Sequence, residues 1–245
     1  MKYMGSKNKI AKDIIPIILD GRKENQWYIE PFCGGLGTFD KVDGNRLACD
    51  NNKYLISMWK GLQQNLERPT NISRELYSAA RSEFNNKTNI QFNNKTNIQF
   101  SDFQIGWIGW MASFNGRFFD GGYSGVAGKR DYINEQIRNT EKQIPLIKGA
   151  VFESGDYRET CMFYPDRSII YCDIPYKNAK QYATSKDFDY ESFYDWCRGM
   201  KSYGHKIFVS EYNAPEDFIC VWEKEVTNSM NPTKTYKPVE RLYTI

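Results

Sequence analysis

Histidine, paired cysteines and long apolar runs are scarce or missing in this sequence. His205 is the single histidine, which argues against a His-dependent catalytic triad and against a multi-histidine metal site. The six cysteines show no Cys-x-x-Cys spacing, so we expect buried free thiols in a reducing compartment. No apolar run reaches membrane-spanning length, and the first residues lack the apolar core of a signal peptide, so we expect a cytoplasmic protein.

The residues that are present describe a folded protein with an aromatic excess. The chain has 245 residues, 40% hydrophobic and 26% charged, enough for one α/β domain with an inserted subdomain. Aromatic residues reach 16%, and such rings fill a core or stack on nucleobases. The net charge is only +3, but residues 68–148 carry 11 Lys and Arg against 7 Asp and Glu. This local excess fits phosphate contact and fits a solvated helical face equally well.

Short apolar strands alternate with amphipathic helices along most of the chain. The expected strands are 27–32, 46–49, 149–152, 169–172, 206–210, 218–223 and a closing strand within 236–245. The expected helices are 10–19, 51–66, 73–82, 131–144 and 188–200, and Pro16 is expected to kink or end the first of them. Such alternation implies a mostly parallel sheet.

Two segments in the middle of the chain interrupt this alternation. Residues 84–91 are repeated without change as 92–99, and their Asn, Thr and Lys content favours a tolerated insertion in an exposed loop over a segment that holds DNA. Residues 107–125 mix aromatics with four glycines between 116 and 125, which suits a loop near a ligand better than a regular element.

The strand at 27–32 runs into a glycine turn at 34–37. Such a turn lets a cofactor approach the backbone closely, although a plain tight turn has the same sequence. The turn does not match the G-x-G-x-x-G fingerprint, so a nicotinamide cofactor is not favoured. Asp50, at the end of the following strand, is placed either to hold ribose hydroxyls or to cap the next helix.

The tetrapeptide Asp173-Ile174-Pro175-Tyr176 follows the apolar strand at 169–172. An aromatic amine is a weak nucleophile because its lone pair is delocalised. The Asp173 carboxylate and the Ile174 carbonyl can accept the two amine hydrogens and direct that lone pair at an incoming methyl group, while Tyr176 stacks on the ring. A duplex base must be flipped out to reach such a pocket. The same four residues also suit an ordinary strand-ending turn.

These segments, in this order, resemble the Dam-like family of S-adenosylmethionine-dependent DNA adenine methyltransferases. The resemblance covers nearly the whole chain. It is carried by residues 3–7 (Tyr-Met-Gly-Ser-Lys), 30–35 (Glu-Pro-Phe-Cys-Gly-Gly), 50 (Asp), 113–117 (Ser-Phe-Asn-Gly-Arg), 155–157 (Gly-Asp-Tyr), 173–176 and 237–242 (Lys-Pro-Val-Glu-Arg-Leu). One such motif is weak evidence, whereas the ordered set is specific.

The resemblance implies an α/β fold, with a Rossmann-like methyltransferase sheet, helices on both faces and an inserted, mainly helical DNA-recognition subdomain. Residues 1–53 and 136–245 would form the catalytic methyltransferase domain, and residues 54–135 the target-recognition subdomain. The implied donor is S-adenosylmethionine, with S-adenosylhomocysteine as its product and no metal. The implied partner is double-stranded DNA, with no membrane and no obligatory protein partner.

The resemblance also assigns roles to individual residues. The expected catalytic residues are Asp173, Ile174, Pro175, Tyr176 and Lys7. The expected cofactor-binding residues are Tyr3, Lys7, Phe32, Cys33, Gly34, Gly35, Gly37, Asp50, Asp156, Tyr157 and Asp173. The candidates for DNA contact are Asn115, Arg117, Lys129 and Arg130, of which the three basic side chains suit plain solvation equally well. Arg241 is expected to contact substrate or to pair with an acid.

One position departs from the family pattern, because Ile174 stands where the family carries a proline. The backbone carbonyl is retained, the fixed φ of proline is lost, and Pro175 still biases residue 174 toward an extended conformation. We therefore predict activity, with methylation of another planar amine (cytosine, an RNA base or a protein amide) or a catalytically weak DNA-binding relic as alternatives. The target sequence cannot be read from the chain.

Overall fold

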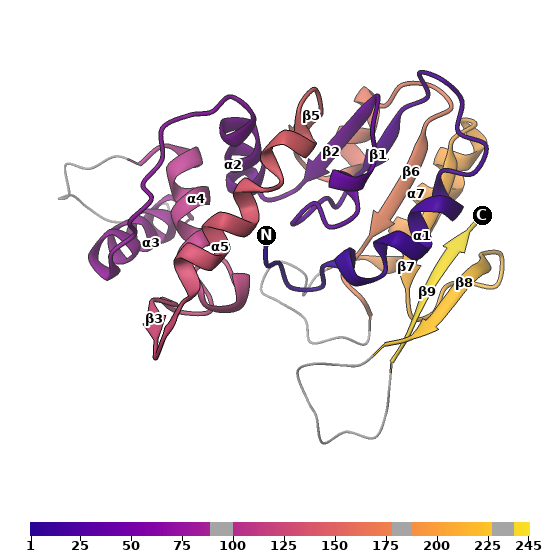
Figure 1. Cartoon of the computed structure of the whole chain (residues 1–245). Helices are drawn as coiled ribbons and strands as arrows, with labels where there is room; N and C mark the ends of the chain where they lie inside the picture. The colour runs from indigo at the N-terminus through magenta and orange to yellow at the C-terminus, as the bar shows by residue number, and fades with distance from the viewer. Residues whose placement is uncertain (89–99, 178–187, 227–237) are drawn as a thin grey trace.

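A seven-stranded sheet forms the centre of the molecule in the computed structural model, which describes residues 1–88, 100–177, 188–226 and 238–245 (Figure 1). The strand order is β5-β2-β1-β6-β7-β9-β8. Neighbouring strands from β5 to β7 are parallel, and β9 runs antiparallel to both β7 and β8. The expected mostly parallel sheet is confirmed. Its strands are β1 (Tyr28–Glu30), β2 (Arg46–Asp50), β5 (Val151–Ser154), β6 (Ile169–Asp173), β7 (Lys206–Glu211), β8 (Ile219–Glu225) and β9 (Val239–Thr244).

Helices cover both faces of this sheet. One hydrophobic core, on the α1 side, contains the α1 residues Ile14 and Ile18 beside Tyr28 of β1. The other, on the α7 side, contains Phe193 of α7 beside Ile170 of β6. This arrangement is the Rossmann-like layering that was expected. The helices are α1 (Ala11–Ile18), α2 (Lys53–Gln63), α3 (Arg74–Thr88), α4 (Asp102–Ala112), α5 (Tyr132–Glu141), α6 (Tyr157–Thr160) and α7 (Tyr190–Ser202).

A helical group lies beyond one end of the sheet, and Figure 1 shows α3, α4 and α5 gathered there. Helix α2 joins this group to the sheet: Gln63 donates to the carbonyls of Ile147 and Ala150 at 2.8 Å, before β5. A two-stranded hairpin, β3 (Val126–Ala127) with β4 (Arg130–Asp131), precedes α5. The core on the α1 side continues into this group through Trp107.

The helix α4 was not expected, because residues 107–125 were interpreted as a loop. Nine of the eleven residues of α4 are buried, so apolar side chains surround the helix and leave no amphipathic period in the sequence. A capping box at Ser101 and Gln104 begins it. The glycine-rich part after Ala112 does form the expected irregular segment, apart from a short 3-10 turn at Phe114–Gly116.

Three smaller expectations have mixed outcomes. Pro16 was expected to kink or end the first helix, and α1 continues through Pro16 to Ile18, so Pro16 does not end it. Four cysteines are buried as free thiols, whereas Cys161 is partly exposed and Cys220 exposed. Most of the repeat at 84–99 lies outside the described residues. Among the residues that are described, no helix is long and apolar enough to cross a membrane.

Candidate active site at the carboxyl edge of the sheet

Four neighbouring parallel strands each end in an acidic residue. These are Asp50 of β2, Glu30 of β1, Asp173 of β6 and Glu211 of β7. Because the carboxyl ends of parallel strands meet at one edge, these acids line the edge where α/β proteins bind ligands. Strand β9 runs the opposite way, so its second residue, Glu240, is brought to the same edge.

Lys7 reaches this edge from the short 3-10 turn Lys7–Lys9 and pairs with the expected catalytic acid. Its ammonium lies 3.0 Å from Asp173 Oδ1 and 3.7 Å from Glu240 Oε2, and it donates to the Gly5 carbonyl at 3.2 Å. The Lys7 side chain is only 8% exposed. The structure therefore brings Lys7 and Asp173 together, although they are far apart in the sequence.

The pKa values of this pair reflect competing effects. Burial raises the pKa of Asp173 above its ordinary value, and the Lys7 ammonium opposes that rise. Burial alone would lower the pKa of Lys7, but the carboxylates of Asp173 and Glu240 raise it overall. Lys7 therefore stays a cation at neutral pH, and it favours the ionised form of Asp173.

The ring of Tyr176 is enclosed by its neighbours. Its hydroxyl donates to Glu240 Oε2 at 2.6 Å, the Lys7 ammonium lies 4.3 Å from the ring centroid, and Tyr212 packs edge-on at 4.6 Å. Only 8% of Tyr176 is exposed. In this conformation the ring is not open to a base, so stacking requires its neighbours to move.

Polar contacts hold the chain that carries the tetrapeptide. Tyr190 donates its hydroxyl to the Pro175 carbonyl at 2.8 Å. The carboxylate of Glu211 accepts the backbone N–H of Lys177 at 3.0 Å and that of Tyr212 at 2.6 Å. The side chain of Ile174 is buried in the core on the α7 side. The tetrapeptide is thus fixed from α7, from β7 and from the core.

The glycine turn lies against the N-terminal segment of the same chain. Gly34 donates its N–H to Asp50 Oδ2 at 3.1 Å, and Asn52 donates its N–H to Oδ1 at 2.9 Å. A Cβ atom on Gly35 would lie 2.4 Å from the Cβ of Tyr3, and one on Gly37 would lie 2.5 Å from Ser6 Oγ. The glycines therefore serve the close approach of residues 3–6.

Aromatic residues from two motifs meet on the other side of this edge. The rings of Phe32 and Tyr157 lie 5.4 Å apart, with Phe188 and Phe193 against Phe32 at 5.8 and 5.9 Å.

Two acids near these rings have shifted pKa values. Asp156 caps α6 and forms a two-pronged pair with Arg158 at 2.7 and 3.0 Å, which holds the pKa of Asp156 below its ordinary value. Burial raises the pKa of Asp50 to about 6.

The expected DNA-contacting residues lie on the helical group and not beside Asp173. Asn115 is exposed and adopts a left-handed backbone with φ of 53°, within the 3-10 turn after α4. Arg117 pairs with Asp120 at 2.7 Å. Arg130 forms a two-pronged pair with Glu135 at 2.6 and 2.9 Å, and Lys129 is exposed at the hairpin turn.

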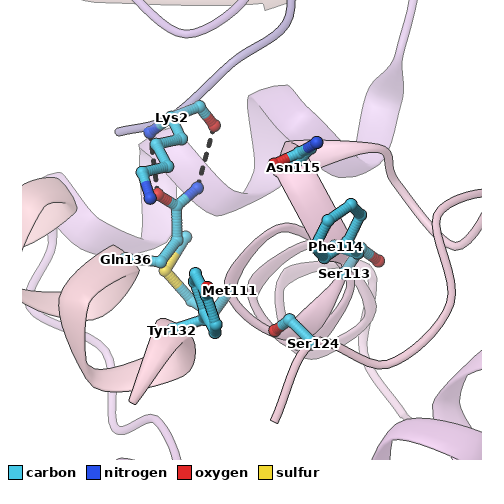
Figure 2. A pocket seen from close by; sticks show the side chains of 9 residues that line it. Lys2, Met111, Ser113, Phe114, Asn115, Ser124, Tyr132 and Gln136 are labelled. Atoms are coloured by element: carbon cyan, nitrogen blue, oxygen red, sulfur yellow. Dashed lines mark hydrogen bonds between the residues drawn. The ribbon is translucent and has the colours of Figure 1, made fainter. Parts of the chain in front are cut away.

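The N-terminal segment connects this helical group to the carboxyl edge of the sheet. Figure 2 shows the Lys2 backbone paired with the amide of Gln136, at 2.8 Å for its N–H and 2.9 Å for its carbonyl. A cavity of about 20 Å³ lies beside these two hydrogen bonds. A larger cavity of about 310 Å³ lies between residues 1–8, the glycine turn and α5. Residues 2–7 therefore run from α5 to Asp173.

Three residues of the site were missed by sequence reasoning. Glu240 was quoted only as part of the closing segment, and Glu211 and Tyr212 were not singled out. Arg241 was expected to contact substrate or to pair with an acid, and it pairs with Glu223 at 3.0 Å and donates to the Tyr212 carbonyl at 2.6 Å. The acids that end four parallel strands were an available signal for Glu211, whereas no such pattern marks Glu240 or Tyr212. Within the described ranges, no group of three His, Cys, Asp or Glu side chains could hold a metal ion.

Comparison with known proteins identifies the family of the chain. A search of curated proteins gives no match. The family model described as D12 class N6 adenine-specific DNA methyltransferase matches residues 3–242, which spans every motif described above. The chain therefore belongs to the D12 class N6 adenine-specific DNA methyltransferase family and is a DNA adenine methyltransferase.

Proposed function

We propose that the protein transfers a methyl group from S-adenosylmethionine to the exocyclic amine of adenine in duplex DNA, and that the target base is flipped into the pocket beside Asp173. The observation that carries the proposal is the Asp173 carboxylate at the end of β6, held 3.0 Å from Lys7 and followed by Tyr176. It provides a fixed acceptor for an amine hydrogen at the sheet edge where a ligand binds.

The residues at the neighbouring strands fit S-adenosylmethionine. Asp50 keeps spare acceptor capacity beyond its two backbone bonds, so it suits ribose hydroxyls, and Phe32 with Tyr157 offers apolar ring surface for an adenine. Asp156 already pairs with Arg158, and its remaining lone pairs suit the adenine amine. When bound, the donor supplies a methyl group on a sulfonium, and the carbon–sulfur bonding pair leaves with the sulfur.

The chain's own residues prepare the amine for attack. Asp173 has one oxygen on Lys7, and within the described part of the chain its second oxygen is not engaged, so it can accept one amine hydrogen. The Ile174 carbonyl accepts the other, which turns the nitrogen lone pair toward the methyl carbon. After the new carbon–nitrogen bond forms, the nitrogen carries a positive charge, and the proton it loses passes toward Asp173 and then to solvent.

Base flipping is part of the proposal because the paired amine of adenine lies inside the duplex. The enzyme must extrude the nucleotide to bring that nitrogen to Asp173. Tyr176 would stack on the flipped base once Tyr212 shifts from its ring, while Lys7 stays between Asp173 and Glu240. Asn115, Arg117, Lys129 and Arg130 would contact DNA from the insert at 54–135, with residues 1–53 and 136–245 as the catalytic domain.

The direct test is transfer of labelled methyl groups from S-adenosylmethionine to duplex DNA of mixed sequence. Wild type is expected to label DNA, and Asp173→Ala is expected to lose at least about a hundredfold of that rate. The matched control is Asp195→Ala on α7, which removes an exposed acid paired with Arg198 and should keep wild-type activity. Label in RNA or protein but not in DNA would contradict the proposed substrate.

A further inference from the structure

Glu240 reaches the site from the one element that runs against the parallel strands. It is the second residue of β9, and its side chain is 15% exposed. A single oxygen, Oε2, accepts the Tyr176 hydroxyl at 2.6 Å and faces the Lys7 ammonium at 3.7 Å. This one carboxylate therefore contacts two residues of the proposed catalytic set.

Lys7 lies between two carboxylates at unequal distances. Asp173 is at 3.0 Å and Glu240 at 3.7 Å, and the ammonium also lies over the face of Tyr176. If the Lys7 ammonium faced Asp173 alone, the full attraction would fall on that carboxylate. The Asp173 carboxylate would then be a poorer hydrogen-bond acceptor for an amine. A second carboxylate divides the attraction and leaves Asp173 a better acceptor.

We propose that Glu240 is a positioning residue for methyl transfer. It shares the Lys7 ammonium with Asp173, and it fixes the Tyr176 ring through the phenol hydroxyl. This inference rests on the proposed function, since Asp173 must be the acceptor for the amine. Glu240 touches neither the donor nor the base in this account, and it acts through Lys7 and Tyr176.

Substitutions at Glu240 and Tyr176 can distinguish this positioning role from a purely structural one. The backbone of Glu240 pairs with Lys224 of β8 in the regular ladder, and this pairing does not require the side chain. A Glu240→Gln substitution keeps an oxygen that accepts the Tyr176 hydroxyl and removes only the charge. A Tyr176→Phe substitution does the reverse, because it removes the hydrogen bond and keeps the Glu240 charge.

The experiment compares steady-state methyl transfer by wild type, Glu240→Gln, Glu240→Asp and Tyr176→Phe. The matched control is Glu225→Gln, an exposed acid on β8 whose register partner is Val239, next to Glu240. For Glu240→Gln we expect kcat to fall at least about tenfold, with the KM for donor and for DNA changed less than about twofold. Glu240→Asp keeps the charge and should recover part of the loss.

Several outcomes would overturn the inference. A kcat for Glu240→Gln equal to that of Glu225→Gln would do so, and so would a rise in KM at unchanged kcat. If Glu240→Gln does not fold, Tyr176→Phe decides, because a wild-type kcat there excludes the anchoring role. Full activity in Asp173→Ala would instead refute the proposed function. An inactive Asp173→Ala together with a fully active Glu240→Gln would refute the inference alone.

Discussion

Buried acids lie along the carboxyl edge of the sheet, and Glu30 and Glu211 are each only 2% exposed. The Oε1 atom of Glu30 accepts the hydroxyls of Tyr28 at 2.6 Å and Thr38 at 2.7 Å. Burial raises the pKa of Glu30 to about 8 despite these two hydrogen bonds. Glu30 is therefore mostly protonated at neutral pH.

A pH titration of stability tests this assignment. The pKa of Glu30 in the folded state lies above the unfolded value of 4.5. Between these two pH values the folded state therefore binds one more proton than the unfolded state. The contribution of Glu30 to stability is complete below pH 4.5 and is lost as the pH rises through 8, by roughly 3–5 kcal/mol. Glu30→Gln keeps an acceptor and should flatten this fall in denaturant unfolding between pH 5 and 9. The same slope in both proteins would contradict the raised pKa.

Ile174 combines a buried side chain with a proposed catalytic backbone carbonyl. Its side chain is 3% exposed in the core on the α7 side. Ile174→Ala should therefore lower the free energy of unfolding by about 2–4 kcal/mol while keeping kcat within about threefold, because the carbonyl is retained. Thermal unfolding and steady-state rates check the two parts. A stable variant with lost turnover would assign the side chain a role in the reaction.

Ile174→Pro asks whether the missing proline limits the rate. The fixed φ of proline would preorganise the carbonyl, at the expense of packing in the core. A turnover above wild type is expected if preorganisation is limiting, and a turnover no higher than wild type shows that it is not.

Functional residues could be predicted where they belong to a sequence motif. They could not be predicted where only the tertiary fold brings them to the site. Asp173 and Lys7 were selected from sequence, and the structure places them 3.0 Å apart. Glu240 lies 64 residues beyond Tyr176, and their hydrogen bond depends on the reversed direction of β9. Sequence periodicity carries no information about such a pairing.

Among the structural elements, the turn at 34–37 requires glycine at Gly35 because a side chain there would have no room beside Tyr3, and not because of an unusual φ. Gly35 has no left-handed φ, yet an added Cβ would lie 2.4 Å from Tyr3 Cβ. Because Tyr3 and Lys7 belong to one short segment, pushing Tyr3 away would displace the ammonium beside Asp173. The turn thus couples Asp50, which accepts from Gly34, to Lys7 and Asp173.

Gly35→Ala is the corresponding test. We expect kcat to fall about tenfold or more and stability to drop by about 1–3 kcal/mol, since the neighbouring backbone must shift. Gly199→Ala is the control, because Gly199 lies within α7 and has nothing within 4 Å of an added Cβ. That change should stabilise slightly and leave kcat unchanged. Wild-type kcat in Gly35→Ala would refute the coupling.

Elements with one apolar face were predictable, whereas α4 was not. Helices α2 and α7 bury one side and show the helical period that identified them. Helix α4 is buried nearly all round, so its sequence is apolar without a period, and the glycines between 116 and 125 favoured a loop for the whole of 107–125. Within α4, Gly106 and Gly109 allow close packing against the Tyr54 carbonyl and the Phe118 ring.

At the scale of the whole molecule, the site is assembled from distant parts of the chain at one sheet edge. The order of motifs predicted the Rossmann-like sheet and the inserted helices. It did not predict that residues 2–7 run from α5 to Asp173, because the hydrogen bonds between Lys2 and Gln136 join residues 134 apart in sequence. The hairpin residue Arg130 and Lys2 both bind Glu135, so the β3–β4 hairpin and the N-terminal segment share one acid.

The proposed function requires Asp173 to activate the exocyclic amine of adenine. The most direct measurement treats duplex DNA with enzyme and S-adenosylmethionine, digests it to nucleosides and identifies the methylated product by mass spectrometry. We expect N6-methyldeoxyadenosine with wild type and none with Asp173→Ala. N4-methyldeoxycytidine as the product, or N6-methyldeoxyadenosine formed equally well by Asp173→Ala, would contradict the proposed function.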